Sequence, residues 1–134
     1  MSKGTINLWS DTVVAEAAIT DRAAVVKGTA EKQGKIAPST NATKVIGLAT
    51  QAQATVGKTC SVQRKGIAEG IAAGEISIGD YVITSGALGR LESLGTLSVG
   101  IGSIKYIVGQ AESDASIAGD IFEVNLNPEL ISVA

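Results

Sequence analysis

Residues 45–62, VIGLATQAQATVGKTCSV, and residues 107–124, IVGQAESDASIAGDIFEV, share one pattern at a spacing of 62 positions. Each segment begins with two aliphatic residues, a Gly, one variable residue and an Ala, and each ends with a Gly followed five positions later by a Val. The pattern predicts two similar β-hairpins, in which a strand, a polar connection and a Gly turn lead into a return strand. Chance similarity between segments rich in Gly, Ala and Val is the alternative.

The glycines of the repeat have two different roles in this interpretation. Gly47 and Gly109 lie inside strands, where a missing side chain marks a bulge or a close approach of another backbone. Gly57 and Gly119 lie in the turns. A phosphate-binding loop needs clustered glycines before a helix, and these glycines are isolated and precede strands. We therefore interpret the repeat as two hairpins of one barrel, not as two domains.

Further strands are predicted on both sides of the repeat, separated by Gly and polar turns such as Gly79-Asp80 and Gly119-Asp120. Fifteen Ile, twelve Val and eleven Thr against eight Leu also favour strands. The sequence therefore predicts an all-β fold, a small β-barrel or sandwich of short antiparallel strands. The predicted strands cover residues 44–49, 59–64, 66–72, 81–84, 88–92, 106–112 and 121–126.

Two segments fit this pattern less directly. Residues 12–27 are compatible with a helix that begins after Ser10 or Asp11, but β-branched residues at both ends favour two short strands around a turn. Residues 94–104 are apolar and rich in Gly, and irregular backbone is expected there rather than a regular helix.

The first twelve residues are expected to form an extended N-terminal arm, followed by the β domain over residues 13–134. In this arm Leu8 and Trp9 are the candidate anchors on a partner. The alternative is an N-terminal strand in which Trp9 completes the core of its own chain, because Trp is enriched both at interfaces and in cores.

The composition excludes several classes of protein. The 134 residues contain no His, which excludes His-based catalysis and most zinc sites, and a single Cys, which excludes an internal disulfide. A net charge of −2 without aromatic and basic clusters gives no footprint for nucleic acid. Charged residues make up only 18%, which favours a component of an oligomer or larger assembly.

No catalytic, cofactor or metal site is predicted. Neither S-x-x-K nor G-x-S-x-G occurs, and the Asp and Glu residues are better explained as solvated turn residues than as a catalytic pair. We expect a protein that is not an enzyme. No targeting segment and no apolar run long enough to cross a bilayer is present, so a soluble protein without membrane contact is predicted.

An ordered series of motifs over about residues 25–127 resembles the capsid decoration (cement) proteins of tailed bacteriophages. The similarity rests on the order of the motifs, since each is common at β-turns. The motifs are Gly66-Ile-Ala, Ile76-x-x-Gly79-Asp80-x-Val82, Gly89-Arg90-Leu91, Val108-Gly109-x-Ala111 and Ala118-Gly119-Asp120-x-x-x-Val124-x-Leu126.

The resemblance implies a structural virion protein that is assembled in the host cytoplasm and lies on the outer surface of the phage head. It implies binding to the major capsid protein and stabilisation of the contacts between its subunits. It also implies self-association as a homotrimer, with a dimer as the alternative. The N-terminal arm, residues 1–12, would clamp the shell, with Ile6, Leu8 and Trp9 as its anchors. The family contributes no catalytic residues or cofactors.

Two other classes of protein are also compatible with the sequence. A small β-barrel binding module for a carbohydrate or a protein partner of another assembly is expected to show exposed clustered aromatic residues, and this chain has only four aromatic residues. An enzyme built from trimeric β domains is the other, and the missing His argues against it.

Overall fold

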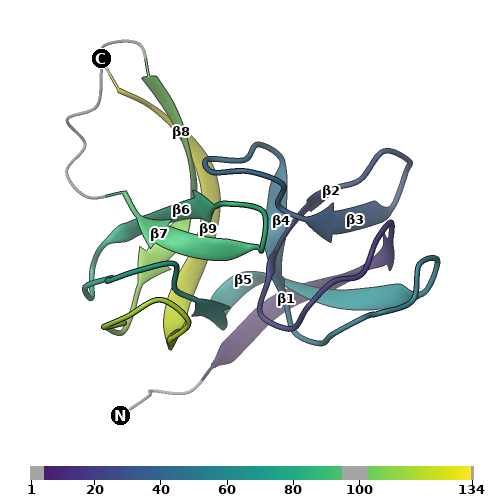
Figure 1. The fold of residues 1–134 in the computed structure, drawn as a ribbon, viewed down its shortest axis with the longest axis horizontal. Coiled ribbons are helices and arrows are strands. Elements are labelled where there is room, and N and C mark those ends of the chain that lie inside the picture. The colour runs from purple at the N-terminus through teal and green to yellow at the C-terminus, as the bar shows by residue number, and fades with distance from the viewer. Residues whose placement is uncertain (1–4, 95–102, 134) are drawn as a thin grey trace.

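The computed structural model describes residues 5–94 and 103–133, and within them every regular element is a β-strand. The all-β prediction is therefore confirmed. Figure 1 shows the nine strands. They are β1 (Ile6–Ala15), β2 (Ala24–Lys27), β3 (Gln33–Ile36), β4 (Val45–Ala49), β5 (Thr59–Ile71), β6 (Tyr81–Ser85), β7 (Arg90–Ser93), β8 (Ser103–Ala111) and β9 (Ile121–Val133).

Strands β1 to β5 form a closed ring, which we call the first ring. Strand β1 pairs with β3, β3 with β2, β2 with β4 and β4 with β5, and β5 returns to β1. All of these pairings are antiparallel except the one between β1 and β3. Closure leaves these short strands with few free edges.

A second ring uses the other end of β5. Strand β5 pairs with β9, β9 with β8, β8 with β6 and β6 with β7. A single parallel bridge between Ala72 and Leu91 brings β7 back to the end of β5. The two rings therefore share β5, which runs between them in Figure 1.

The two rings repeat the same register. Val25 pairs with Gly47 in the first ring, as Val82 pairs with Gly109 in the second. Ala49 pairs with Val62, as Ala111 pairs with Val124. The predicted hairpin repeat is thus part of a longer one, and its copies lie in two rings rather than in one barrel.

The repeat extends to the loops. The amide N–H of Arg22 donates to the carbonyl of Ala49, as that of Gly79 donates to the carbonyl of Ala111. Ile19 forms a bridge with Gln53, as Ile76 does with Ala115. Loop residues whose local sequences differ therefore occupy equivalent places in the two rings.

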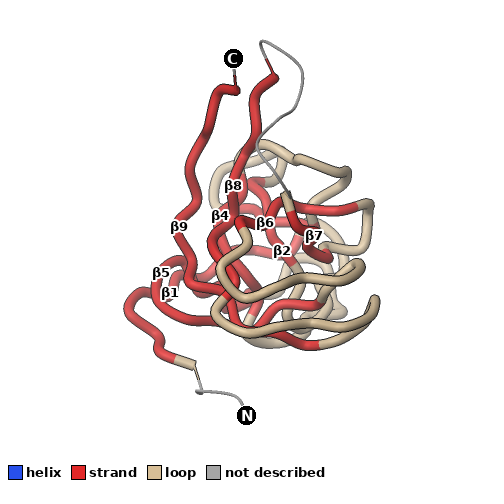
Figure 2. The backbone as a smooth tube through the Cα atoms, turned by 90° about the vertical axis from the view of Figure 1, so that its left-hand side faces the viewer, coloured by secondary structure: helices blue, strands red, loops and turns tan. Residues whose placement is uncertain are grey.

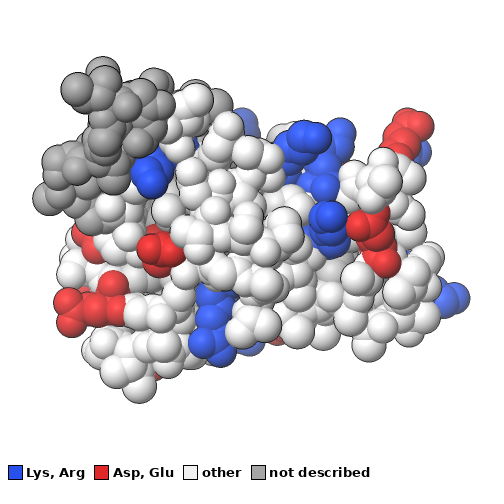
Figure 3. Space-filling model, turned by 45° about the horizontal axis from the view of Figure 1, so that its top comes forward, with Lys and Arg blue, Asp and Glu red and all other residues white. Residues whose placement is uncertain are grey.

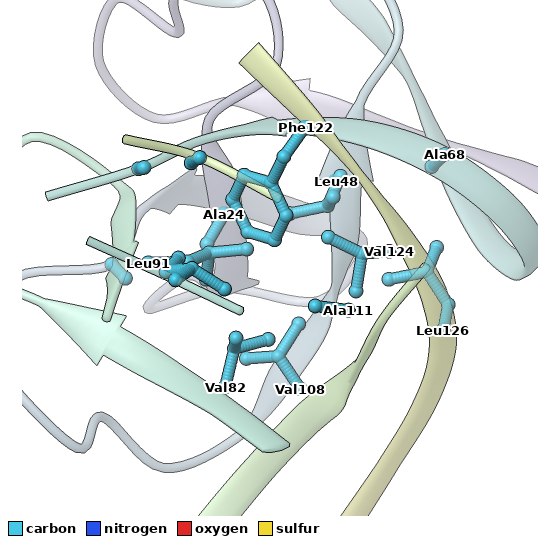
Figure 4. Packing of buried hydrophobic residues seen from close by; sticks show 14 of the residues in the cluster. Ala24, Leu48, Ala68, Val82, Leu91, Val108, Ala111, Phe122, Val124 and Leu126 are labelled. Carbon is cyan, nitrogen blue, oxygen red and sulfur yellow. The ribbon is translucent and has the colours of Figure 1, made fainter. Parts of the chain in front are cut away.

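Each ring encloses its own buried cluster, and equivalent positions fill both. Seven of the eight buried side chains in the first ring's cluster have a buried counterpart in the second, among them Ile19 and Ile76, Cys60 and Phe122, and Val62 and Val124. Figure 4 shows Phe122 in the middle of the second cluster, with Leu48, Leu91 and Val124 around it. Leu48 and Ala24 of the first ring also belong to that cluster, so apolar packing continues across the boundary between the rings.

One pair of core positions is filled in opposite order in the two rings. In the first ring Val13 lies against Gly34, where an added Cβ would come within 2.7 Å of the Val13 Cγ2. In the second ring the equivalents are Gly70 and Leu91, and an added Cβ on Gly70 would come within 3.0 Å of the Leu91 Cδ1. The large residue has changed strand, so the space inside each ring is filled from opposite sides.

Several strand boundaries differ from those predicted. Residues 59–64 and 66–72 were expected as separate strands, but β5 is continuous and bends at Gly66, whose φ is +99°. Strand β3 was missed because its sequence, QGKI, is mostly polar. Residues 12–27 do form two strands around a turn, as favoured over the helix. Of the expected irregular segment 94–104, residues 95–102 lie outside the described residues, and Ser103 and Ile104 begin β8.

Strands β8 and β9 continue beyond the second ring as a two-stranded ribbon, which Figure 2 shows projecting toward the C-terminus. The outer edge of β8 is bound by one side chain from the first ring. The Asn41 Nδ2 donates to the carbonyl of Ile104 at 2.9 Å, and the Tyr106 amide N–H donates to the Asn41 Oδ1 at 2.8 Å. The Asn41 amide group thus caps the edge of β8 at Ile104 and Tyr106, where another strand could otherwise pair.

Candidate docking surface

The three predicted anchors lie on the N-terminal half of β1. Ile6, Leu8 and Trp9 are exposed by 53%, 71% and 47% of their surface, and none belongs to either buried cluster. Residues 6–14 run antiparallel along β5. The first half of β1 therefore presents three large apolar side chains to solvent while its backbone is held by β5.

A pair of bulges explains why these side chains point outward. The register between β1 and β5 shifts between Asn7 and Trp9, where Leu8 has no partner, and shifts back between Trp9 and Ser10. An extra residue on one strand re-aims the side chains near it and increases the local twist. Leu8, the most exposed apolar residue of the three, is the extra residue.

Two residues of β5 hold this half of β1 in place. Gln63 is 97% buried, and its Nε2 donates to the carbonyl of Ile6 at 2.9 Å and to that of Lys65 at 3.0 Å. Gly66 has a left-handed backbone, and an added Cβ would overlap the carbonyl oxygen of Ile6. Close backbone contact at the bend of β5 therefore requires glycine. Gln63 was not predicted as a functional residue, and only its place in a mostly apolar strand hints at a buried polar role.

Trp9 is positioned by charged neighbours. The Arg64 guanidinium lies over its ring, 4.4 Å from the ring centroid, and also pairs with the Asp11 carboxylate at 3.2 Å. A cation over an exposed ring is worth about 0.5–1 kcal/mol, and an exposed ion pair adds about 0–1 kcal/mol. These contacts orient the indole without burying it, so its apolar face stays available to a partner.

We expect Gln63→Leu to loosen the first half of β1, because the amide is the only described side chain that bonds the carbonyl of Ile6. The cost should be about 1–2 kcal/mol in the free energy of unfolding. Amide hydrogen exchange over residues 6–12 should become faster. Asn125→Leu is the matched control, because Asn125 occupies the equivalent place in the second ring and is exposed. Equal effects of the two changes would contradict this role of Gln63.

The predicted turn residues have structural roles. Gly57, Gly79 and Gly119 have φ values of +88°, +91° and +94°. The Asp80 Oδ2 accepts hydrogen bonds from the Ser77 amide N–H and the Ser93 hydroxyl at 3.0 and 2.9 Å. The Asp120 Oδ2 accepts them from the Ser116 and Ile117 amides at 3.0 and 3.2 Å. Both carboxylates therefore stabilise turns.

The remaining predicted residues are Gly47 in β4 and Gly109 in β8. Each faces a backbone carbonyl oxygen of the strand beside it, at equivalent positions in the two rings. An added Cβ on Gly47 would overlap the carbonyl oxygen of Gln63, and one on Gly109 would overlap that of Asn125. Gln63 and Asn125 are themselves equivalent positions. The close approach of backbone expected for these two glycines is thus found in both rings.

No group of three or more His, Cys, Asp or Glu side chains within the described residues is arranged to hold a metal ion. The described part of the chain also contains no helix that is long and apolar enough to span a membrane. Burial raises the pKa of the Cys60 thiol above its usual value, and the Asp21 carboxylate adds to the increase.

Cys60 provides a test of how tightly the first ring is packed. A buried thiol with a raised pKa reacts only through its small thiolate fraction after local opening. Labelling by a disulfide reagent should therefore be at least about 100-fold slower in the native protein than in urea. Ser61→Cys in a Cys60→Ser background, one position along β5 and half-buried, should react faster. Rapid native labelling of Cys60 would contradict a closed first ring.

No family model and no curated protein matches the chain. Among solved structures, the fold is similar to that of a protein from a bacteriophage head, the base of a head fiber. That protein is the N-terminal base of head fiber gp8.5 of bacteriophage phi29, with a TM-score of 0.60 and 18% sequence identity. The match covers 89% of this chain and 93% of the phage chain. At this identity the comparison establishes a shared fold.

Proposed function

We propose that this chain is a structural component of a bacteriophage head that binds the outer surface of the shell. The observation that carries the proposal is the fold shared with a head fiber base over nearly the whole length of both chains. The decoration-protein motifs in the sequence agree with a structural role. The partner is the major capsid protein, whose subunit contacts the bound chain stabilises.

The docking surface of this proposal is the first half of β1. Ile6, Leu8 and Trp9 form an exposed apolar group on a backbone that β5 holds in place, so binding does not require ordering of a loose arm. Repetition over a shell multiplies a modest contact, and self-association as a homotrimer multiplies it again. Deleting residues 1–12 would remove a strand of the first ring, so point variants give the cleaner test.

The test is co-sedimentation of the purified chain with phage heads that lack it. Leu8→Asp and Trp9→Ala should each weaken binding by at least about tenfold, because burying a large apolar side chain contributes about 1.5–3 kcal/mol. Leu88→Asp is the matched control, because Leu88 is 65% exposed in the turn between β6 and β7. Unchanged binding of both variants would exclude this surface. A wild-type chain that binds no head would overturn the proposed function in favour of a separate binding module.

A further inference from the structure

The two rings share a fold but carry opposite charge. Residues 1–65 contain nine Lys or Arg and four Asp or Glu, whereas residues 66–134 contain two and nine. The formal charges of the two halves are therefore +5 and −7, although the whole chain is nearly neutral at −2. Equivalent positions show the reversal directly, since Lys35 on β3 corresponds to Glu92 on β7.

The positive charge is concentrated on one surface of the first ring, which we call the lysine face. It consists of Lys27, Lys32, Lys35 and Lys44. Three of them, Lys27, Lys35 and Lys44, line a hollow of about 380 Å³ whose lining includes no Asp or Glu. Lys32 lines a second hollow together with Lys27, and Asp11 and Glu31 also line that one. Among the described residues, only Lys35 of the four forms a salt bridge, with Glu16 at 3.7 Å. Figure 3 shows basic side chains gathered over this part of the molecule, with acidic side chains beside them and further acidic ones at the opposite end.

Backbone strain is retained at the lysine face. Lys32 and Lys44 have φ values of +62° and +61°, in the left-handed region that favours glycine. The position equivalent to Lys32 in the second ring is Gly89, with φ of +72°. The fold therefore accommodates glycine at this turn without strain, and the first ring keeps a lysine there instead. A strained residue that glycine replaces elsewhere in the same chain points to a role for its side chain.

The complementary charge lies on the second ring. Glu75 and Asp114 are exposed, and Glu92 and Glu112 are half-buried; we call these four residues the acidic face. Backbone contacts keep their segments together, since the Ala73 amide N–H donates to the carbonyl of Leu91 at 2.7 Å and Ile76 forms a bridge with Ala115. The segments that carry the acidic face therefore lie side by side in the second ring.

We propose that copies of this chain associate head to tail, with the lysine face of one copy against the acidic face of the next. This inference rests on the proposed function, which places many copies on one shell. We choose a second copy as the partner of the lysine face because each copy carries the complementary acidic face. Such a contact joins two different surfaces, so it forms a closed ring when the rotation between copies closes. Complementary charge speeds this association and fixes its register.

The test is sedimentation velocity of the full chain at low and high salt. The wild type should associate in about 50 mM salt and dissociate in about 0.5 M salt, because salt screens exposed charges. Lys32→Glu with Lys44→Glu should weaken self-association at least about tenfold. Adding Glu75→Lys and Glu92→Lys to the same chain should restore it. Lys58→Glu, which makes the same kind of charge change outside the lysine face, should associate like the wild type.

A milder variant separates association from folding. Lys32→Gly should melt at no lower temperature than the wild type, because it removes a left-handed lysine, and it should still associate less well. A wild type that is monomeric at every salt concentration would overturn the inference, as would charge-reversed variants that associate normally. Salt-sensitive binding to phage heads by a monomer would assign the lysine face to the shell protein instead. Self-association without any head binding would support this inference and contradict only the proposed function.

Discussion

Gly47→Ala and Gly109→Ala should each lower the free energy of unfolding by at least about 3 kcal/mol, and the Val variants should lower it further. At each position the new Cβ would overlap a backbone carbonyl oxygen of the next strand, that of Gln63 or of Asn125. The overlapping atom belongs to the backbone in both cases, so no flexible side chain can move away to make room for the new Cβ. Urea denaturation followed by circular dichroism measures the effect.

The control for this prediction is Gly74→Ala. An added Cβ on Gly74 meets no atom within 4 Å, and its backbone is not left-handed, so the change should cost less than about 0.5 kcal/mol. Similar costs at Gly47 and Gly109 would support the equivalence of the two hairpins. Variants at Gly47 and Gly109 that unfold like the Gly74 variant would contradict the close strand contact in both rings.

Gly34→Leu should have the second large effect, a loss of about 2–4 kcal/mol, because the new side chain would fill space that Val13 already occupies. The second ring holds a Leu at the equivalent position, Leu91, where it faces Gly70. The double variant Val13→Gly with Gly34→Leu reproduces that arrangement in the first ring. It should recover at least about 1 kcal/mol relative to Gly34→Leu alone.

Thermal and urea unfolding of the four proteins in this double-mutant cycle give the coupling energy between the two positions. Val13→Gly alone should also destabilise the protein, because it leaves a cavity and places a glycine in β1. Additive costs of the two single changes would mean that the two rings fill their interiors differently, despite their equal register.

Most strands were predictable because alternation and Gly turns are local features. The hairpin repeat was predictable for the same reason, since Gly47 and Gly109 recur with the same neighbours. The longer repeat was not visible. The spacing changes from 57 to 62 residues after β3 and β7, and pairs such as Val13 with Gly70 and Gly34 with Leu91 differ in size. The two rings still have the same backbone shape there, because a large residue replaces a glycine at one position and a glycine replaces a large residue at the other.

Ring closure was also beyond sequence reasoning. The parallel pairing of β1 with β3 depends on where distant strands meet, and the bridge between Ala72 and Leu91 joins single residues. Nothing in the local pattern of QGKI marks β3 as a strand, because pairing on both sides, rather than apolar alternation, keeps it extended. The two repeated hairpins were therefore predictable, and the division into two rings was not.

For the docking surface, composition identified Ile6, Leu8 and Trp9 but left their environment open. The structure places Trp9 on a strand and under Arg64, outside both buried clusters. The bulges that expose Leu8 depend on the register with β5, and no sequence motif encodes them. The contribution of Gln63 likewise depends on which carbonyls the fold brings to its amide.

The most direct test of the proposed role is a cryo-electron microscopy reconstruction of phage heads incubated with the purified chain. We expect extra density on the outer surface of the shell, fitted by the two rings, with Ile6, Leu8 and Trp9 at the contact with the major capsid protein. Heads without added density, or density in which the first half of β1 faces solvent, would contradict it.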